Sequence, residues 1–113
     1  MRNLLIWFLL FAPIPAAADQ SWKPKADQVA HLEKILKMPA GTHPMGEYGR
    51  HYWGDTVEGA RVIRGTLVYG ERVGVYLANT APLERFTDQG CDRVRVQYNL
   101  SKNRVIASCD GTG

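Results

Sequence analysis

The side chains best suited to metal or catalytic chemistry lie near the middle of the chain. His43, Glu47 and His51 follow one another at intervals of four residues. On a helix this spacing would align them as ligands for zinc or copper, and an open metal site can activate water. A proline and two glycines in the same stretch disfavour a helix, although on a strand Glu47 and His51 would share a face. A metal-dependent or small-ligand-binding module that uses these three residues is therefore an alternative hypothesis. The simpler interpretation is that the histidines bind no ligand.

The chain lacks the sequence signatures of nucleophilic catalysis and of zinc binding. It contains neither a G-x-S-x-G nor an H-E-x-x-H sequence. Its two cysteines, Cys91 and Cys109, are too far apart to form a C-x-x-C pair. We therefore predict no catalytic residue, no resident metal and no cofactor.

Aromatic residues next to an arginine are the first binding candidates. Tyr48, Arg50, Tyr52 and Trp53 lie within six consecutive residues, and this composition is favoured in binding hot spots. The same residue types are also common in protein cores. On a strand, Tyr48, Arg50 and Tyr52 would share one face while His51 and Trp53 share the other, so one of the two faces is expected to be core.

Two arginines nearer the C-terminus are further binding candidates. Arg93 and Arg95 alternate with Val94 and Val96, so both arginines are expected on the face away from the valines. Arginines on neighbouring predicted strands could extend them into an anion-binding stripe for an acidic partner or lipid headgroups; these are Arg61, Arg64, Arg72 and Arg104. The simpler interpretation is a solvated sheet face whose charges prevent edge-to-edge aggregation.

The first eighteen residues have the pattern of a signal peptide. One arginine precedes an apolar run from Leu4 to Ala12, prolines then interrupt the run, and three alanines end at Ala18. The run is much shorter than the roughly 20 apolar residues of a membrane span. We predict cleavage after Ala18, a periplasmic or secreted location, and a mature chain (19–113) without a membrane span.

Export favours a disulfide between Cys91 and Cys109, because small exported domains commonly use paired cysteines. A hairpin with Leu100 at its centre would place the two cysteines directly opposite each other. Opposed Cα atoms lie about 4.5–5.5 Å apart, within the range of roughly 4.4–6.8 Å that a disulfide accepts. The same register predicts Val94 opposite Ile106.

The periodicity of the apolar residues predicts the elements that position these side chains. Apolar residues at 29, 32 and 36 form one helical stripe within residues 24–37. Gly70-Glu71 fits a two-residue hairpin turn, and residues 54–59 form a polar turn. The predicted strands are 47–53 (or a short helical turn), 60–69, 72–78, 92–98 and 104–109.

A chain of 113 residues allows one domain. One helix with a single apolar stripe must cover a four- or five-stranded antiparallel sheet, which predicts an α+β fold with an N-terminal helix and a cystatin-like layout. A small β-barrel with a peripheral helix is the alternative.

Several short motifs occur in a recognisable order between residues 47 and 111. They are Tyr48-x-Arg50-x-Tyr52, Gly74-Val75-Tyr76, Gly90-Cys91 with alternating Val94, Val96 and Tyr98, and Cys109-Asp110-Gly111. In this order they resemble uncharacterised small exported proteins of Gram-negative bacteria. The resemblance implies a periplasmic location and a bridge between the two cysteines, and it implies no catalytic residue.

These features together favour a small exported binding or inhibitory module without catalytic activity, with an envelope protein as its partner. The net charge of +3 is too small to indicate nucleic-acid binding. A carrier that holds an apolar molecule between helix and sheet is a third hypothesis.

Export and the disulfide together predict the mass of the protein. Material from the exported fraction should have the denatured mass of residues 19–113 less two hydrogens, and reduction should restore both hydrogens. Denaturing mass spectrometry before and after reduction measures both effects. A mass that includes residues 1–18 contradicts cleavage, and a mass unchanged by reduction contradicts the disulfide.

Overall fold

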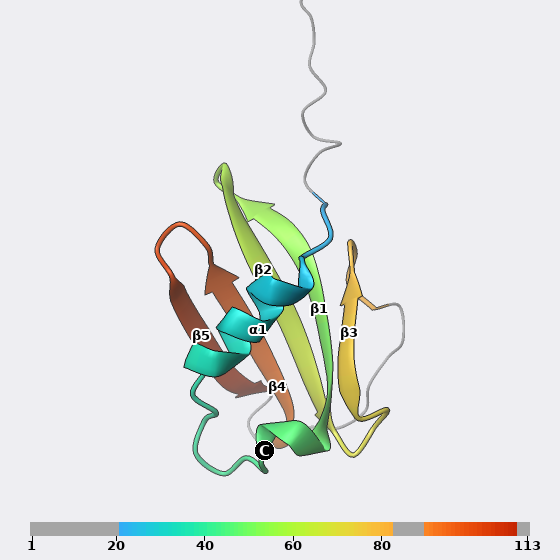
Figure 1. Cartoon of the computed structure of the whole chain (residues 1–113). Coiled ribbons are helices and arrows are strands. Elements are labelled where there is room, and N and C mark those ends of the chain that lie inside the picture. The colour runs from blue at the N-terminus through green and yellow to red at the C-terminus, as the bar shows by residue number, and fades with distance from the viewer. Residues whose placement is uncertain (1–20, 83–89, 111–113) are drawn as a thin grey trace, which may run out of the picture.

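The structure, a computed structural model, describes residues 21–82 and 90–110. Over these residues one α-helix lies across one face of a five-stranded sheet, which confirms the α+β prediction (Figure 1). A short 3₁₀ turn (Met45–Glu47) leads into the first strand. The elements are α1 (Ala26–Ile35), β1 (Tyr48–Val57), β2 (Ala60–Tyr69), β3 (Gly74–Ala78), β4 (Gly90–Asn99) and β5 (Arg104–Asp110).

Helix α1 is shorter at both ends than the predicted range 24–37. At its start, the side-chain oxygen of Gln28 accepts a hydrogen bond of 2.8 Å from the backbone N–H of Lys25, which satisfies a donor at the helix N-terminus. At its end, Leu36 has an extended backbone and leaves the helix. The predicted apolar stripe nevertheless faces the core.

Strands β1 and β2 form a long antiparallel hairpin that pairs from Tyr48 and Tyr69 to Val57 and Ala60. The turn is the dipeptide Glu58-Gly59, whereas the sequence predicts a turn over 54–59. Both turn residues have positive φ angles, 51° and 82°. Two such residues suffice for a tight hairpin turn, so the strand continues four residues beyond the predicted end at 53.

The sheet is open and mixed, with the strand order β3-β1-β2-β4-β5. Neighbouring strands are antiparallel except β3, which runs parallel to β1. The predicted purely antiparallel sheet is therefore wrong at this edge, and so is the closed barrel. A hairpin between β2 and β3 does not form because the second edge of β2 is already paired with β4.

The connection from β2 to β3 passes across the start of β1, and this crossing depends on Gly49. A Cβ atom at Gly49 would collide with the carbonyl oxygen of Glu71. The backbone N–H of Gly70 donates to the carbonyl of Glu47 at 2.9 Å, and Arg72 and Gly74 bend the chain with φ angles of 51° and 139°. The chain thereby reaches the outer edge of β1.

The hairpin of β4 and β5 confirms the disulfide but not the predicted register. Cys91 and Cys109 are bonded, with their Cα atoms 4.6 Å apart. Val94 lies opposite Cys109, and Ile106 lies opposite Gln97 instead of Val94. The bridge still forms because the pairing of β4 with β5 is irregular between Gly90 and Val94.

The physical reason for the shifted register is a loop whose centre lies further along the chain than expected. The side-chain oxygen of Asn99 accepts hydrogen bonds from the backbone N–H of Lys102 at 3.0 Å and from the hydroxyl of Ser101 at 2.9 Å. Asn103 then closes the loop with a φ of 51°. This side-chain-stabilised loop spans 100–103, so its centre lies beyond Leu100.

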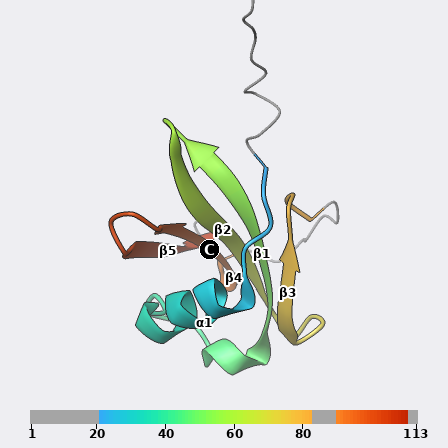
Figure 2. The same cartoon turned by 45° about the horizontal axis from the view of Figure 1, so that its top comes forward.

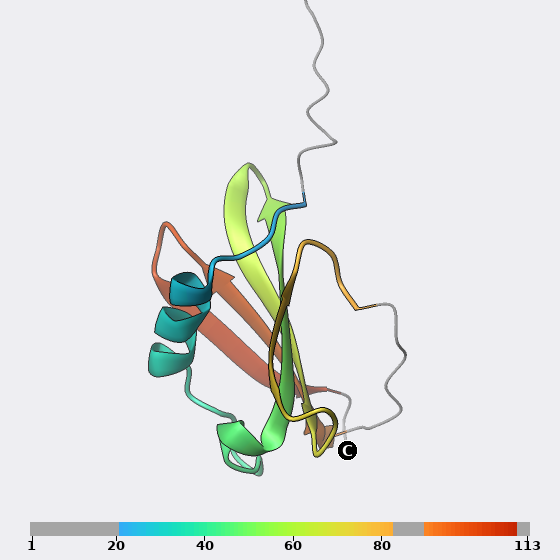
Figure 3. The ribbon, with the colours of Figure 1, turned by 45° about the vertical axis from the view of Figure 1, so that its right-hand side comes forward.

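The core lies between α1 and the sheet, which Figure 3 shows from the side. Alternation along β1 points Tyr48, Arg50 and Tyr52 towards the helix, and the ring of Tyr52 packs over Gly65 on β2. The buried core residues are Val29, Leu32, Leu36, Tyr48, Tyr52, Ile63, Leu67, Val94, Val96 and Tyr98.

The segment before α1 is anchored to β1 by Trp22, which sequence analysis did not single out. Its carbonyl accepts a hydrogen bond from Gly54 N–H and its indole N–H donates to the carbonyl of Asp55, both at 2.9 Å. Figure 2 shows this segment running alongside the β1–β2 hairpin. Because Gly54 has no side chain, the indole of Trp22 can pack directly against its backbone. The guanidinium of Arg61 lies 4.6 Å from the centroid of the indole ring.

The crossing over β1 gives a prediction for stability. We expect Gly49→Ala to lower the free energy of unfolding by about 1–3 kcal/mol or more, because the added methyl meets backbone that cannot rotate away. Gly46→Ala is the matched control, since a Cβ there meets nothing within 4 Å. Urea denaturation of both variants measures the difference, and equal midpoints would show that the crossing tolerates a side chain.

Candidate functional site

The sheet presents two chemically different faces, because successive side chains on a strand alternate. One face packs against α1 and is mainly apolar. The opposite face, here called the far face, carries polar and charged residues from the three central strands. Register places Trp53 beside Arg64 on β2, and it places Thr66 beside Arg95 on β4.

A cavity of about 270 Å³ opens on the far face. We call its polar and aromatic lining the basic pocket: Trp53, Arg64, Thr66, Arg93 and Arg95. Ala81 and Pro82, from the segment after β3, complete one wall with apolar surface, and Gly65 and Val96 also line the cavity. Three guanidinium groups and one indole therefore line a single cavity.

Arg64 is held in place by contacts on either side. Its Nε donates to the Asp55 carboxylate at 2.7 Å, and its Nη1 donates to the side-chain oxygen of Gln97 at 2.9 Å. The hydrogen bond from Arg64, followed by one from the Thr56 backbone N–H, lowers the pKa of Asp55 below its ordinary value. Asp55 is therefore ionised at neutral pH and balances the charge of Arg64, and Arg93 and Arg95 line the same cavity.

Three of the six predicted binding residues come together at this pocket: Trp53, Arg93 and Arg95. Sequence analysis counted Arg64 only as part of a wider stripe and did not select Thr66. Alternation along residues 60–69 places both on one face, but pairing with β4 was needed to bring Thr66 beside Arg95. Of the other stripe residues, Arg61 lies over Trp22 instead.

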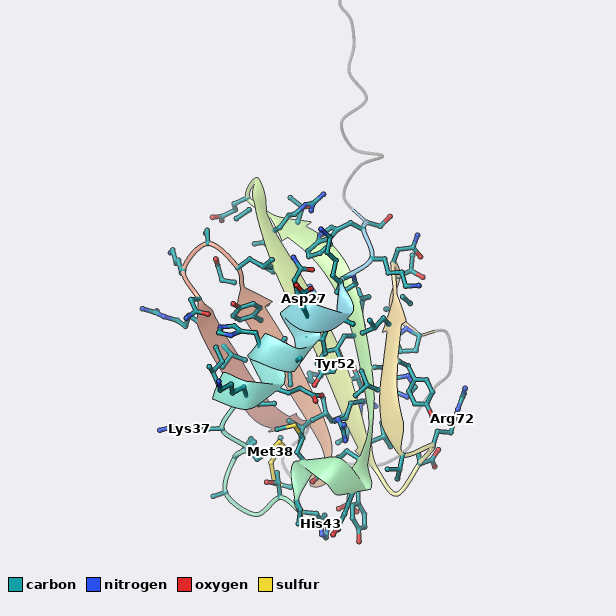
Figure 4. All side chains as sticks on the ribbon, in the orientation of Figure 1. Asp27, Lys37, Met38, His43, Tyr52 and Arg72 are labelled. Atoms are coloured by element: carbon teal, nitrogen blue, oxygen red, sulfur yellow. A yellow bond between two sulfur atoms is a disulfide. The ribbon has the colours of Figure 1, made fainter. Side chains whose placement is uncertain are left out.

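The other three predicted binding residues lie beneath the helix. Tyr48 and Tyr52 are 0% and 1% exposed, so they are core residues rather than surface contacts. Arg50 donates from Nε to the Glu33 carboxylate at 2.8 Å, and the Tyr52 hydroxyl donates to the same oxygen at 2.7 Å (Figure 4 labels Tyr52). Burial, followed by the contact with Glu33, raises the pKa of Tyr52 well above its usual range.

Tyr48 links the loop after α1 to the disulfide hairpin. Its hydroxyl donates to the carbonyl of Cys91 at 2.8 Å and accepts a hydrogen bond of 3.1 Å from the backbone N–H of His43. Burial is the main cause that raises the pKa of Tyr48. This tyrosine therefore connects backbone groups of the loop and the hairpin.

The structure does not bring His43, Glu47 and His51 together. His43 lies at one end of the sheet, where its ring stacks on Tyr69 with 3.6 Å between centroids (Figure 4). His51 is on the far face and stacks on Tyr76 at 4.9 Å, while Glu47 is exposed in the 3₁₀ turn. Over residues 21–82 and 90–110, no three His, Cys, Asp or Glu side chains are grouped to hold a metal ion.

We compared the chain with protein-family models, with curated proteins and with solved structures. None of the three comparisons found a significant match. In the part of the chain that the structure describes, no helix has the length and apolar character needed to cross a membrane. Function is therefore inferred from the geometry of this chain.

The pairing of Asp55 with Arg64 predicts a pH dependence of stability. Because the pKa of Asp55 is lower in the folded state, the pair stabilises the fold above the unfolded value of about 3.9. This contribution is lost as the pH falls through the lower folded pKa. We expect Asp55→Asn to cost less than about 1 kcal/mol at pH 7, since both side chains are 36% exposed.

Urea denaturation between pH 7 and pH 2 measures this difference, with Glu58→Gln at an exposed turn as the charge-matched control. The gap between wild type and Asp55→Asn should close below about pH 4. A gap that persists unchanged at pH 2 would mean that the charge of Asp55 does not stabilise the fold.

Proposed function

We propose that this protein is a small exported binding module that recognises an anionic partner through the basic pocket and catalyses no reaction. The observation that carries the proposal is the convergence of Arg64, Arg93, Arg95 and Trp53 on one cavity of about 270 Å³. The partner is an envelope protein with exposed carboxylates. If binding blocks the activity of that protein, the module acts as an inhibitor.

The chemistry of the pocket suits a carboxylate or another oxyanion. A guanidinium presents several planar N–H donors that match the two oxygens of a carboxylate. The hydroxyl of Thr66 can donate or accept a further hydrogen bond. The indole of Trp53 and the wall formed by Pro82 offer apolar surface to the carbon atoms that carry the anionic group. The pocket therefore combines charge recognition with apolar contact.

The position of the pocket also supports recognition. Its residues belong to β1, β2 and β4, which are hydrogen-bonded neighbours in the middle of the sheet. Arg64 is oriented beforehand by Asp55 and Gln97. A preorganised site loses less conformational entropy on binding than a site on a flexible loop.

Export is supported by the pattern of residues 1–18 and by the Cys91–Cys109 disulfide, a bond that persists in oxidising compartments. In the periplasm the chain would meet the proteins of the cell envelope, which is why we place its partner there. Localising the protein in periplasmic and cytoplasmic fractions tests this part of the proposal separately from binding.

Citrate is a suitable first probe because it carries several carboxylates and tests anion binding without a partner protein. In a titration followed by ¹H–¹⁵N NMR, citrate should shift the backbone signals of Trp53, Thr66 and Arg95. We expect Arg95→Gln to weaken this binding roughly tenfold, since a hydrogen bond to a charged group is worth about 1.5–3 kcal/mol.

Arg104→Gln is the control, because it removes the same charge from an exposed position outside the basic pocket. An equal loss of affinity in both variants would show that citrate responds to the net charge of the protein and not to the basic pocket. Shifts that avoid the three pocket residues would place the anion elsewhere, and either result contradicts the proposal.

A further inference from the structure

A second cavity adjoins the basic pocket on the far face. It has a volume of about 240 Å³ and lies over β4 and β5. Arg64, Arg95 and Val96 line both cavities, so the two lie side by side. We call the combined depression the sheet groove. Its additional lining residues are Gln97, Ile106 and Ser108.

The sheet groove runs across the strands. Trp53 on β1 pairs with Arg64 on β2, Arg64 pairs with Gln97 on β4, and Gln97 pairs with Ile106 on β5. Neighbouring strands lie about 4.8 Å apart, so this row extends roughly 14 Å. An extended peptide rises about 3.3 Å per residue, so four or five residues span the row.

The chemistry changes along the groove in an ordered way. Trp53 and Pro82 make one end apolar, and Arg64 and Arg95 make the middle basic. The other end is apolar again at Ile106, whose side chain is 58% exposed. An exposed isoleucine beside a basic cavity is a favourable contact for a ligand that carries both a carboxylate and an apolar side chain.

We infer that the sheet groove binds an extended acidic segment of the partner protein, with acidic side chains over Arg64 and Arg95 and an apolar side chain against Ile106. This inference rests on the proposed function of the basic pocket and extends it to the class of ligand. The length of the row and the two apolar ends both favour a short peptide over a small anion.

Nucleic acid fits this groove less well than an acidic peptide. A nucleic-acid strand carries a phosphate at every nucleotide and is bound through arginines or lysines along its path. Here the positive charges lie in the middle of the row. The phosphates at the two ends of a bound strand would meet apolar side chains instead of positive charges.

The test uses two fluorescein-labelled hexapeptides in fluorescence polarisation. The first is Gly-Leu-Gly-Glu-Gly-Glu, in which the leucine and both glutamates lie on one face of the extended chain, and in the second the leucine is serine. We expect Ile106→Ser to weaken binding of the leucine peptide roughly fivefold, since it removes apolar contact area. Binding of the serine peptide should not change.

Val73→Ser is the matched control, because Val73 is 53% exposed and does not line the groove. Both replaced side chains are exposed, so both variants are expected to remain folded, which circular dichroism verifies. A loss of affinity that is confined to Ile106→Ser and to the leucine peptide supports the inference.

The remaining outcomes separate the two proposals. If Arg95→Gln weakens both peptides while Ile106→Ser weakens neither, the inference about the groove is overturned and the basic pocket stands. If neither peptide binds although citrate does, the site takes small anions and the inference is again overturned. Tighter binding of labelled decathymidylate than of the leucine peptide overturns it in favour of nucleic acid. If neither peptide, citrate nor decathymidylate binds, the proposed function itself fails.

Discussion

The half-buried contact of Glu33 with Arg50 and Tyr52 ties the helix to one face of the sheet. The two charged side chains are only 17% and 15% exposed, and Tyr52 donates to the same carboxylate oxygen. Removing one partner of this pair would leave the other charge partly shielded from water without its counter-charge, which destabilises the fold. Apolar packing alone would hold α1 less specifically, since apolar contacts have no preferred direction.

The basic pocket lies on the face opposite the helix. Strand β1 serves both faces: Tyr48 and Tyr52 lie in the core, while Trp53 lines the basic pocket. The rigidity of the pocket therefore derives from the same strand that anchors the helix. A change in the core position of β1 would move the indole of Trp53 as well, which couples stability to binding.

Two strand pairings, those of β3 and of β4 with β5, could not be predicted from local sequence. The segment after Gly70 resembles a hairpin strand, yet β3 pairs with β1 because β4 occupies the available edge of β2. The β4–β5 register differs from the predicted one because Asn99 stabilises a loop centred beyond Leu100. In both cases short-range patterns were compatible with two pairings, and long-range contacts selected one of them.

Residue patterns were enough to predict the helix, most strand positions, the pairing of Cys91 with Cys109 and the alternation of side chains. Helix and strands follow from local periodicity and turn residues, and the disulfide follows from the presence of only two cysteines in an exported chain. Alternation is symmetrical with respect to the two faces of a sheet, so it did not show whether Tyr52 or Trp53 lies in the core. The packing of the helix selects the face, because the helix must bury its apolar stripe and Glu33 contacts Arg50 on that face. The gathering of Arg64, Thr66 and Arg95 was likewise decided by the pairing of β2 with β4, since register is a long-range property of the sheet.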